Sequence, residues 1–183
     1  MTNAPALHEY RNSPFRGAFL RGGRYWLQCQ RGKRLDERLA YVLDLEKRHF
    51  EEIGFLPAPR LEKYLQSGQL WMAQENAEYC GFMVWGRGWP VLRVYQVCVQ
   101  YDAQRREHGF GLVRRLIAKA DQEGYEAISC YVADDIDAND FWRACGFQCV
   151  GQRDNSNVRG RLHNHWVMRM PRPMQGQLLV AAA

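Results

Sequence analysis

Residues 104–112, QRREHGFGL, stand between a stretch typical of a β-strand and a stretch typical of a helix. The strand is predicted over 91–99 by its β-branched sequence, VLRVYQVCV. The helix is predicted over 110–124, because apolar residues recur there at helical spacing until Gly124 ends the pattern. A turn that leads from a strand into a helix is therefore expected near the centre of the chain.

The composition of this turn suits a bound phosphate group. The first N–H groups of a helix have no partner within the helix and carry a partial positive charge. Gly109 and Gly111 place no side chain between such groups and an anion, and Arg105 and Arg106 add full positive charges. No third glycine and no Gly-Lys-Ser/Thr triplet follows, so the turn is neither a dinucleotide fingerprint nor a P-loop. From these residues alone, a pyrophosphate cradle and an ordinary turn both remain open.

The flanking patterns predict an α/β fold: a single domain with a mixed, mostly antiparallel central sheet of about seven strands flanked by helices. Strands are expected over 24–30, twice within 69–88 around a turn at 75–78, and over 91–99, 126–134, 147–152 and 163–170. Helices are expected over 35–50, 59–68, 110–124 and 135–145. Residues 24–170 should form the domain, between an N-terminal arm at 1–23 and a C-terminal tail at 171–183.

The overall composition is that of a globular protein with a basic surface. The chain of 183 residues has a net charge of +5, which favours an anionic partner without identifying one. It has no apolar run long enough to span a membrane and no signal-peptide pattern at its start, so we expect a cytoplasmic protein. The six cysteines lack CxxC spacing and are expected to be reduced thiols, mostly buried. His163 and His165 have no further ligands nearby, so no metal site is expected.

A second block of sequence adds to the first. Residues 138–147, ANDFWRACGF, resemble the Ala-x-x-Phe-Tyr-x-x-x-Gly-Phe segment of the GCN5-related N-acetyltransferase (GNAT) superfamily. The turn, Arg106-x-x-Gly109-x-Gly111, resembles the (Arg/Gln)-x-x-Gly-x-(Gly/Ala) signature of the same family. The separation of the blocks by one helix and one strand, and the earlier order of two helices and a three-stranded meander, are also similar. The resemblance covers roughly residues 24–170.

This resemblance implies an acyl-CoA-dependent N-acyltransferase that uses acetyl-CoA or another acyl-CoA. The cosubstrate is expected in an opening between the parallel strands 91–99 and 127–132, with the pyrophosphate at the backbone of 106–112. The amine would attack the thioester directly, without an acyl-enzyme. The family's pattern assigns cofactor contacts to Val97, Cys98 and Val99 at the end of the first strand, to Arg105, Arg106, Glu107, His108, Gly109, Phe110, Gly111 and Leu112 in the turn, and to Asn139 and Trp142 in the second block.

Two positions depart from the family's pattern. Trp142 stands where a tyrosine often protonates the departing thiolate, and the indole N–H is not a usable acid. The strand 91–99 contains no Asp or Glu, so the frequent general base is missing from it. Tyr131, Cys98 and Tyr95 are the candidate substitutes, because they lie on the strands that should flank the thioester. Asp134, Asp135 and Asp137 could bind a cationic amine, although helix capping is the commoner role of Asp there.

Three functions remain open for the acceptor. The first is acyl transfer to a small-molecule or protein amine. The second is transfer to nucleic acid, as aminoacyl-tRNA or a modified base, with Arg159, Arg161 and Trp166 as contacts, since basic side chains beside an aromatic ring suit phosphate binding and base stacking. The third is a non-catalytic module that binds acyl-CoA. The oligomeric state is expected to be a monomer or a homodimer.

Overall fold

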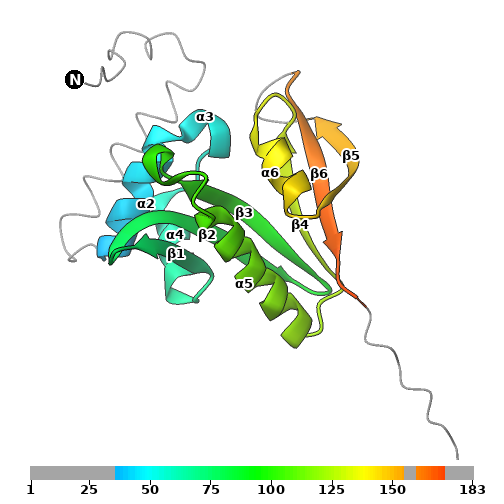
Figure 1. Cartoon of the computed structure of the whole chain (residues 1–183), viewed down its shortest axis with the longest axis horizontal. Coiled ribbons are helices and arrows are strands. Elements are labelled where there is room, and N and C mark those ends of the chain that lie inside the picture. The colour runs from blue at the N-terminus through cyan, green and yellow to red at the C-terminus, as the bar shows by residue number, and fades with distance from the viewer. Residues whose placement is uncertain (1–35, 155–159, 172–183) are drawn as a thin grey trace, which may run out of the picture.

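The computed structural model describes residues 36–154 and 160–171, which contain one mixed sheet of six strands in the order β1-β2-β3-β4-β6-β5. Helices pack on the sheet, and the predicted fold class is confirmed (Figure 1). The strand predicted over 24–30, the N-terminal arm and nearly all of the C-terminal tail lie outside the described residues. No helix in the described ranges is both long enough and apolar enough to cross a membrane.

The first half of the sheet is an antiparallel meander preceded by helices. Helices α2 (Glu37–Arg48), α3 (Phe50–Ile53) and α4 (Ala58–Gln66) lead into β1 (Leu70–Glu75), β2 (Glu78–Gly88) and β3 (Val91–Val99). The helix predicted over 35–50 begins at the cap residue Asp36, whose side chain accepts a hydrogen bond from the Arg38 N–H (2.9 Å). The predicted turn between β1 and β2 is present, with Asn76 and Ala77 both at positive φ, as a two-residue type I′ hairpin requires.

The second half of the sheet follows a helical crossover. A short 3₁₀ helix, η2 (Tyr101–Ala103), precedes α5 (His108–Gln122), β4 (Ala127–Ala133), α6 (Ala138–Ala144), β5 (Gln148–Asp154) and β6 (Leu162–Arg169). Strand β4 pairs in parallel with β3. On its other side β4 pairs antiparallel with β6, and β6 pairs antiparallel with β5, so the β5–β6 hairpin completes this edge of the sheet.

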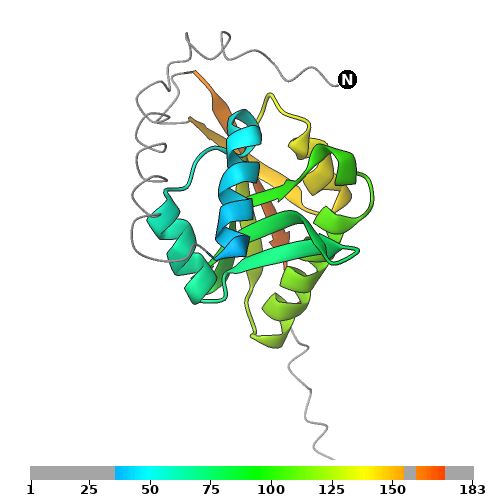
Figure 2. The same cartoon turned by 90° about the vertical axis from the view of Figure 1, so that its left-hand side faces the viewer.

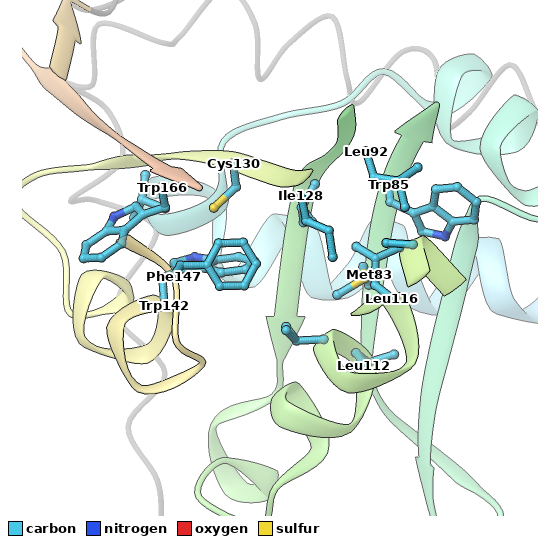
Figure 3. Packing of buried hydrophobic residues seen from close by; sticks show 14 of the residues in the cluster. Met83, Trp85, Leu92, Leu112, Leu116, Ile128, Cys130, Trp142, Phe147 and Trp166 are labelled. Carbon is cyan, nitrogen blue, oxygen red and sulfur yellow. The ribbon is translucent and has the colours of Figure 1, made fainter. Parts of the chain in front are cut away.

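Apolar side chains form a buried cluster on each face of the sheet. One cluster lies under α5 and α6 and contains Met83, Leu116, Ile128, Trp142 and Trp166, which Figure 3 shows packed between helix and sheet. The other lies under α2 and α4 and is built from Val42, Leu45, Leu61, Phe82 and Cys98. In Figure 2 α2 lies across one face of the meander while α5 lies on the other. The two faces of β3 are therefore closed by different helices.

Strand β3 pairs with β4 over only three positions, from Val91–Ala127 to Arg93–Ser129. Just beyond, β3 contains a bulge: Trp85 of β2 pairs with Val94 and Val84 pairs with Gln96, so Tyr95 is the extra residue. A bulge bends its strand and increases the local twist. From this point the two halves of the sheet diverge, as Figure 1 shows, and the predicted parallel pair opens toward its carboxyl ends.

Candidate active site

The turn before α5 has a backbone conformation that suits an anion. Arg105 and Glu107 both have positive φ (61° and 65°), although neither is glycine. The first helical hydrogen bond near this end runs from the Gly111 N–H to the Glu107 carbonyl (2.8 Å). The N–H groups of His108, Gly109 and Phe110 precede it at the helix N-terminus and have no carbonyl of their own helix to bind. A turn that combines left-handed residues with such N–H groups is a typical anion-binding concavity.

The two glycines of the turn have different surroundings. A Cβ atom on Gly111 would meet no atom within 4 Å, so the surface there is open. A Cβ atom on Gly109 would lie 3.1 Å from the ring of Phe141, because α6 packs closely against this end of α5. The rings of Phe110 and Phe141 also meet edge to face, with centroids 5.6 Å apart. An anion at Gly111 would therefore meet backbone N–H groups rather than side chains, as a diphosphate group requires.

The charged side chains of the turn are held by β1. Arg106 Nη1 lies 2.9 Å from Glu75 Oε2, and His108 Nε2 lies 3.7 Å from the same oxygen. Both partners of the Arg106 pair are partly exposed, so the pair fixes the position of the turn more than it stabilises the fold. Arg105 is exposed beside it. The positive charge predicted for the turn is thus present, with Arg106 partly neutralised by Glu75.

The strand residues predicted to hold the thioester lie where β3 diverges from β4. Val97 and Val99 pack with the cluster under α5, as does Leu112 from the first turn of that helix. Cys98 points to the opposite face, into the cluster under α2 and α4. Burial raises the pKa of its thiol to about 12, so this thiol is a buried group that stays protonated at neutral pH.

The two candidate tyrosines lie on different strands. Tyr95, the bulge residue, is exposed, with its ring against Gly86 and 5.5 Å from that of Tyr64 of α4. Burial and the neighbouring Tyr64 raise its pKa. Tyr131 lies on β4 beyond the last residue that pairs with β3, and its half-buried ring stacks on His165 of β6 (4.4 Å). The Arg153 guanidinium lies 3.5 Å from the centre of the Tyr131 ring. Tyr131 therefore borders the diverging strands, whereas Tyr95 borders α4.

The second sequence block serves mainly to build the core around α6. The ring of Trp142 is 5% exposed and packs edge to face against Phe147 (4.8 Å) and Phe141 (5.3 Å). Asn139 is buried, and its Nδ2 donates to the carbonyls of Ala133 (2.7 Å) and Ile136 (2.8 Å). Its Oδ1 accepts from Trp166 Nε1 (3.0 Å). These side chains thereby fix the loop between β4 and α6.

Of the residues predicted to contact nucleic acid, Arg161 and Trp166 do not form one surface. Trp166 is 3% exposed and donates to Asn139, so the prediction that its ring stacks on a base is wrong. Arg161 binds Asp135 Oδ1 (2.9 Å) and the Glu51 carbonyl (3.3 Å), and thus links α3 to the loop before α6. The hydrogen bond and charge of Arg161 lower the pKa of Asp135. Arg159 lies outside the described residues.

The sequence interpretation missed a buried carboxylate beside β3. Glu46 of α2 is 2% exposed, and its Oε1 accepts hydrogen bonds from the Leu56 N–H (2.6 Å) and from Gln96 Nε2 of β3 (2.8 Å). Burial raises its pKa to about 7, although both hydrogen bonds oppose that rise. The helical pattern of the sequence could have indicated that Glu46 is buried. Glu46 and His49 follow Leu39 and Val42 at a spacing of three or four, and so lie on the same buried stripe.

Residues 36–154 and 160–171 contain no group of three or more His, Cys, Asp or Glu that could hold a metal ion. The cysteines in those ranges are all free thiols; Cys80, Cys98 and Cys130 are buried, and Cys149 is exposed. The site therefore consists of a backbone anion cradle, a pair of diverging strands, and the polar groups around them.

A comparison with protein-family models matches residues 38–147 to the family described as acetyltransferase (GNAT) family. The chain belongs to this family. The matched range is more than half of the chain and includes both sequence blocks, so the resemblance found in the sequence is confirmed. A search of curated proteins by sequence gave no match for this chain.

Solved structures share the fold of this chain at low sequence identity. Ard1 from Thermoplasma volcanium is 14% identical with a TM-score of 0.66, covering 74% of this chain and 93% of that one. The ribosomal-protein-S18-alanine N-acetyltransferase from Escherichia coli is 17% identical with a TM-score of 0.61, covering 80% and 96%. N-acetylglutamate synthase from Neisseria gonorrhoeae, complexed with coenzyme A and N-acetyl-glutamate, is 15% identical with a TM-score of 0.63, covering 75% and 34%. At these identities the similarity concerns the fold.

Proposed function

We propose that this protein transfers an acetyl group from acetyl-CoA to a primary amine. The observation that carries the proposal is the divergence of β3 from β4 directly before the anion-binding turn of α5. Membership of the acetyltransferase family supports acyl-CoA as the cosubstrate, as does the related synthase complexed with coenzyme A. Acetyl-CoA supplies the activated thioester, and the residues of this chain hold and orient it.

From this geometry we infer a side of the sheet for each substrate. The N–H groups of the α5 N-terminus take the pyrophosphate, and the edge of β3 beyond Arg93 is free of β4 and holds the pantetheine and the thioester. Because α5 and α6 cover one face of the opening, the amine approaches from the face that carries α2. Tyr131 lies on that face, since Cys130 and Val132 point to the other.

The reaction needs little covalent chemistry from the protein. The amine nitrogen attacks the thioester carbonyl carbon, the C–S bond breaks, and the coenzyme thiolate departs. A thiol has a pKa near 8.5, so the thiolate is a tolerable leaving group without a strong acid. Positioning of the two substrates in one geometry supplies most of the acceleration. Tyr131 is our candidate to donate a proton to the thiolate.

Gly111 offers a clean test of acetyl-CoA binding. Gly111→Asp places a carboxylate in open space at a helix N-terminus, where a negative charge does not destabilise the fold but repels a pyrophosphate. We expect the thermal stabilisation by acetyl-CoA to be lost in this variant and kept in Gly111→Ala, because the family signature allows alanine there. Stabilisation that is equal in both variants, or absent from the wild type at millimolar acetyl-CoA, contradicts the proposal.

Turnover tests the rest of the proposal. The wild-type protein is incubated with acetyl-CoA and with lysine peptides, polyamines or aminoacyl-tRNA, and released coenzyme A is measured as free thiol. Acetylation of at least one of these amines is expected. Binding of acetyl-CoA without transfer to any of them would instead support the non-catalytic acyl-CoA-binding module.

A further inference from the structure

The polar groups between α2 and β3 form a buried cluster that the proposed cosubstrate does not use. Glu46 lies on α2 and His49 is the C-cap residue of that helix, and Gln96 faces Glu46 from β3. All three are nearly inaccessible, with 2%, 2% and 4% of their surface exposed. Polar side chains at this depth are normally fully hydrogen-bonded, so unpaired atoms among them indicate a polar ligand or ordered water.

Two buried side-chain atoms of this cluster have no hydrogen-bond partner among the described residues. His49 Nδ1 lies 2.9 Å from the Glu52 carboxylate and donates to it, and the buried Nε2 of the same ring has no hydrogen-bond partner among the described residues. Gln96 Nε2 faces the Glu46 carboxylate and the Ile53 carbonyl, so Gln96 Oε1 points away from them and is also unpaired. The hydrogen bonds from the Leu56 N–H and from Gln96 Nε2 to Glu46 both end on Oε1.

The cluster also lies close to the point where β3 leaves β4. Gln96 is three residues beyond Arg93, the last residue of β3 that pairs with β4. The bulge at Tyr95 turns Gln96 toward α2, on the face opposite to α5. A primary amine is rich in N–H donors, and in its ammonium form it has three, so it complements the acceptor oxygens of Gln96 and of the Glu46 carboxylate.

We propose that Glu46 is the general base of the acetyl transfer and that His49 and Gln96 position the amine or the water that carries its proton. The inference rests on the proposed function. As the amine nitrogen forms its bond to the carbonyl carbon and the C–S bond breaks, the proton leaves the nitrogen for Glu46. The thiolate takes a proton to become coenzyme A, and Glu46 later releases its own proton to solvent.

The charges around Glu46 suit this role. Glu52, Arg48 and Glu46 itself all act on the charge of the Cys98 thiol of β3. Glu52 also pairs with His49, whose ring lies 4.1 Å from that of Tyr101. The pKa of Glu46, raised to about 7 by burial, lies near the operating pH, where a general base works best. The hydrogen bond from Gln96 lowers that pKa, so Gln96 controls the pH at which the base becomes active.

The test compares pH profiles of turnover, using the amine that the acceptor panel identifies. Wild-type kcat is expected to rise with pH through about 7. Glu46→Gln, which keeps the shape of the side chain, should lower kcat about 100-fold or more at pH 7 and remove that rise. Gln96→Met should keep the rise and move its midpoint upward by about one pH unit, because one hydrogen bond to the carboxylate is lost. A purely structural role would not move this midpoint.

The outcomes separate the two proposals. Acetyl-CoA stabilisation and wild-type turnover, combined with a Glu46→Gln variant that keeps at least half of the wild-type kcat, would overturn the role of Glu46 and leave the acetyltransferase proposal intact. An unchanged midpoint in Gln96→Met would also overturn it, even if Glu46→Gln does not fold. A wild-type protein that neither binds acetyl-CoA nor acetylates any amine overturns both.

Discussion

Replacing Glu46 with glutamine should change how the stability of the protein depends on pH. The carboxyl group is 2% exposed, and burial raises its pKa from 4.5 to about 7. The folded state therefore favours the protonated form. A raised carboxyl pKa contributes stability that is fully present below about pH 4.5 and is lost as the pH rises through about 7. The glutamine variant has no proton to lose at this position.

The size of the effect follows from the pKa change. At about 1.4 kcal/mol per pKa unit, full ionisation of buried Glu46 lowers the free energy of unfolding by about 3 kcal/mol. Of this loss, about 2.5 kcal/mol occurs between pH 5 and pH 8. We expect the stability of the wild type to fall relative to Glu46→Gln by this amount over that range. The other titrating groups are common to both proteins and cancel in the difference.

The measurement is urea denaturation of both proteins at pH 5, 6, 7 and 8, followed by tryptophan fluorescence. Glu51→Gln is the matched control, because this carboxylate is exposed on the neighbouring helix α3. For this control, the stability difference from the wild type should stay constant with pH. A constant difference between the wild type and Glu46→Gln would refute the reasoning, since the Glu46 carboxyl would then ionise equally easily in the folded and unfolded chains.

Three further predictions concern the core and the site. Leu116→Ala removes a fully buried side chain under α5 and should lower the free energy of unfolding by about 2–5 kcal/mol in urea denaturation. Trp142→Phe should lower the free energy of unfolding but leave the Kd for acetyl-CoA unchanged in calorimetry, because the indole packs in the core. A large loss of affinity without a loss of stability would show instead that Trp142 contacts the cosubstrate. Tyr131→Phe should reduce kcat with little change in acetyl-CoA affinity, and unchanged kcat would exclude Tyr131 as the acid.

Much of the architecture could be predicted from local sequence. The alternation and β-branching of 91–99, the helical spacing after Gly109 and the short polar turn at 75–78 all appear in the structure at nearly the predicted bounds. These features depend on neighbours in the chain, so a single sequence contains them. The turn between β3 and α5 was predictable for the same reason, because a glycine-containing turn and the helix that follows it are contiguous.

Other parts of the site depend on contacts between distant segments. Simple alternation along 91–99 would place Val94, Gln96 and Cys98 on one face of the sheet. The bulge at Tyr95 instead leaves Val94 under α5 and turns Gln96 and Cys98 toward α2. The predicted roles of Trp166 and Cys98 assumed accessible side chains, whereas the packing of α6 and α2 buries them.

The sequence by itself determined the order of the elements and the turn that can receive a pyrophosphate, because both depend on the periodicity and conformational freedom of contiguous residues. Only the tertiary structure decided which polar groups meet at the opening of the sheet. Glu46 and Gln96 are 50 positions apart, and their contact exists because a one-residue bulge changes the face on which Gln96 lies. Burial by α2 and β3 together then gives the Glu46 carboxyl its raised pKa, which no local pattern specifies.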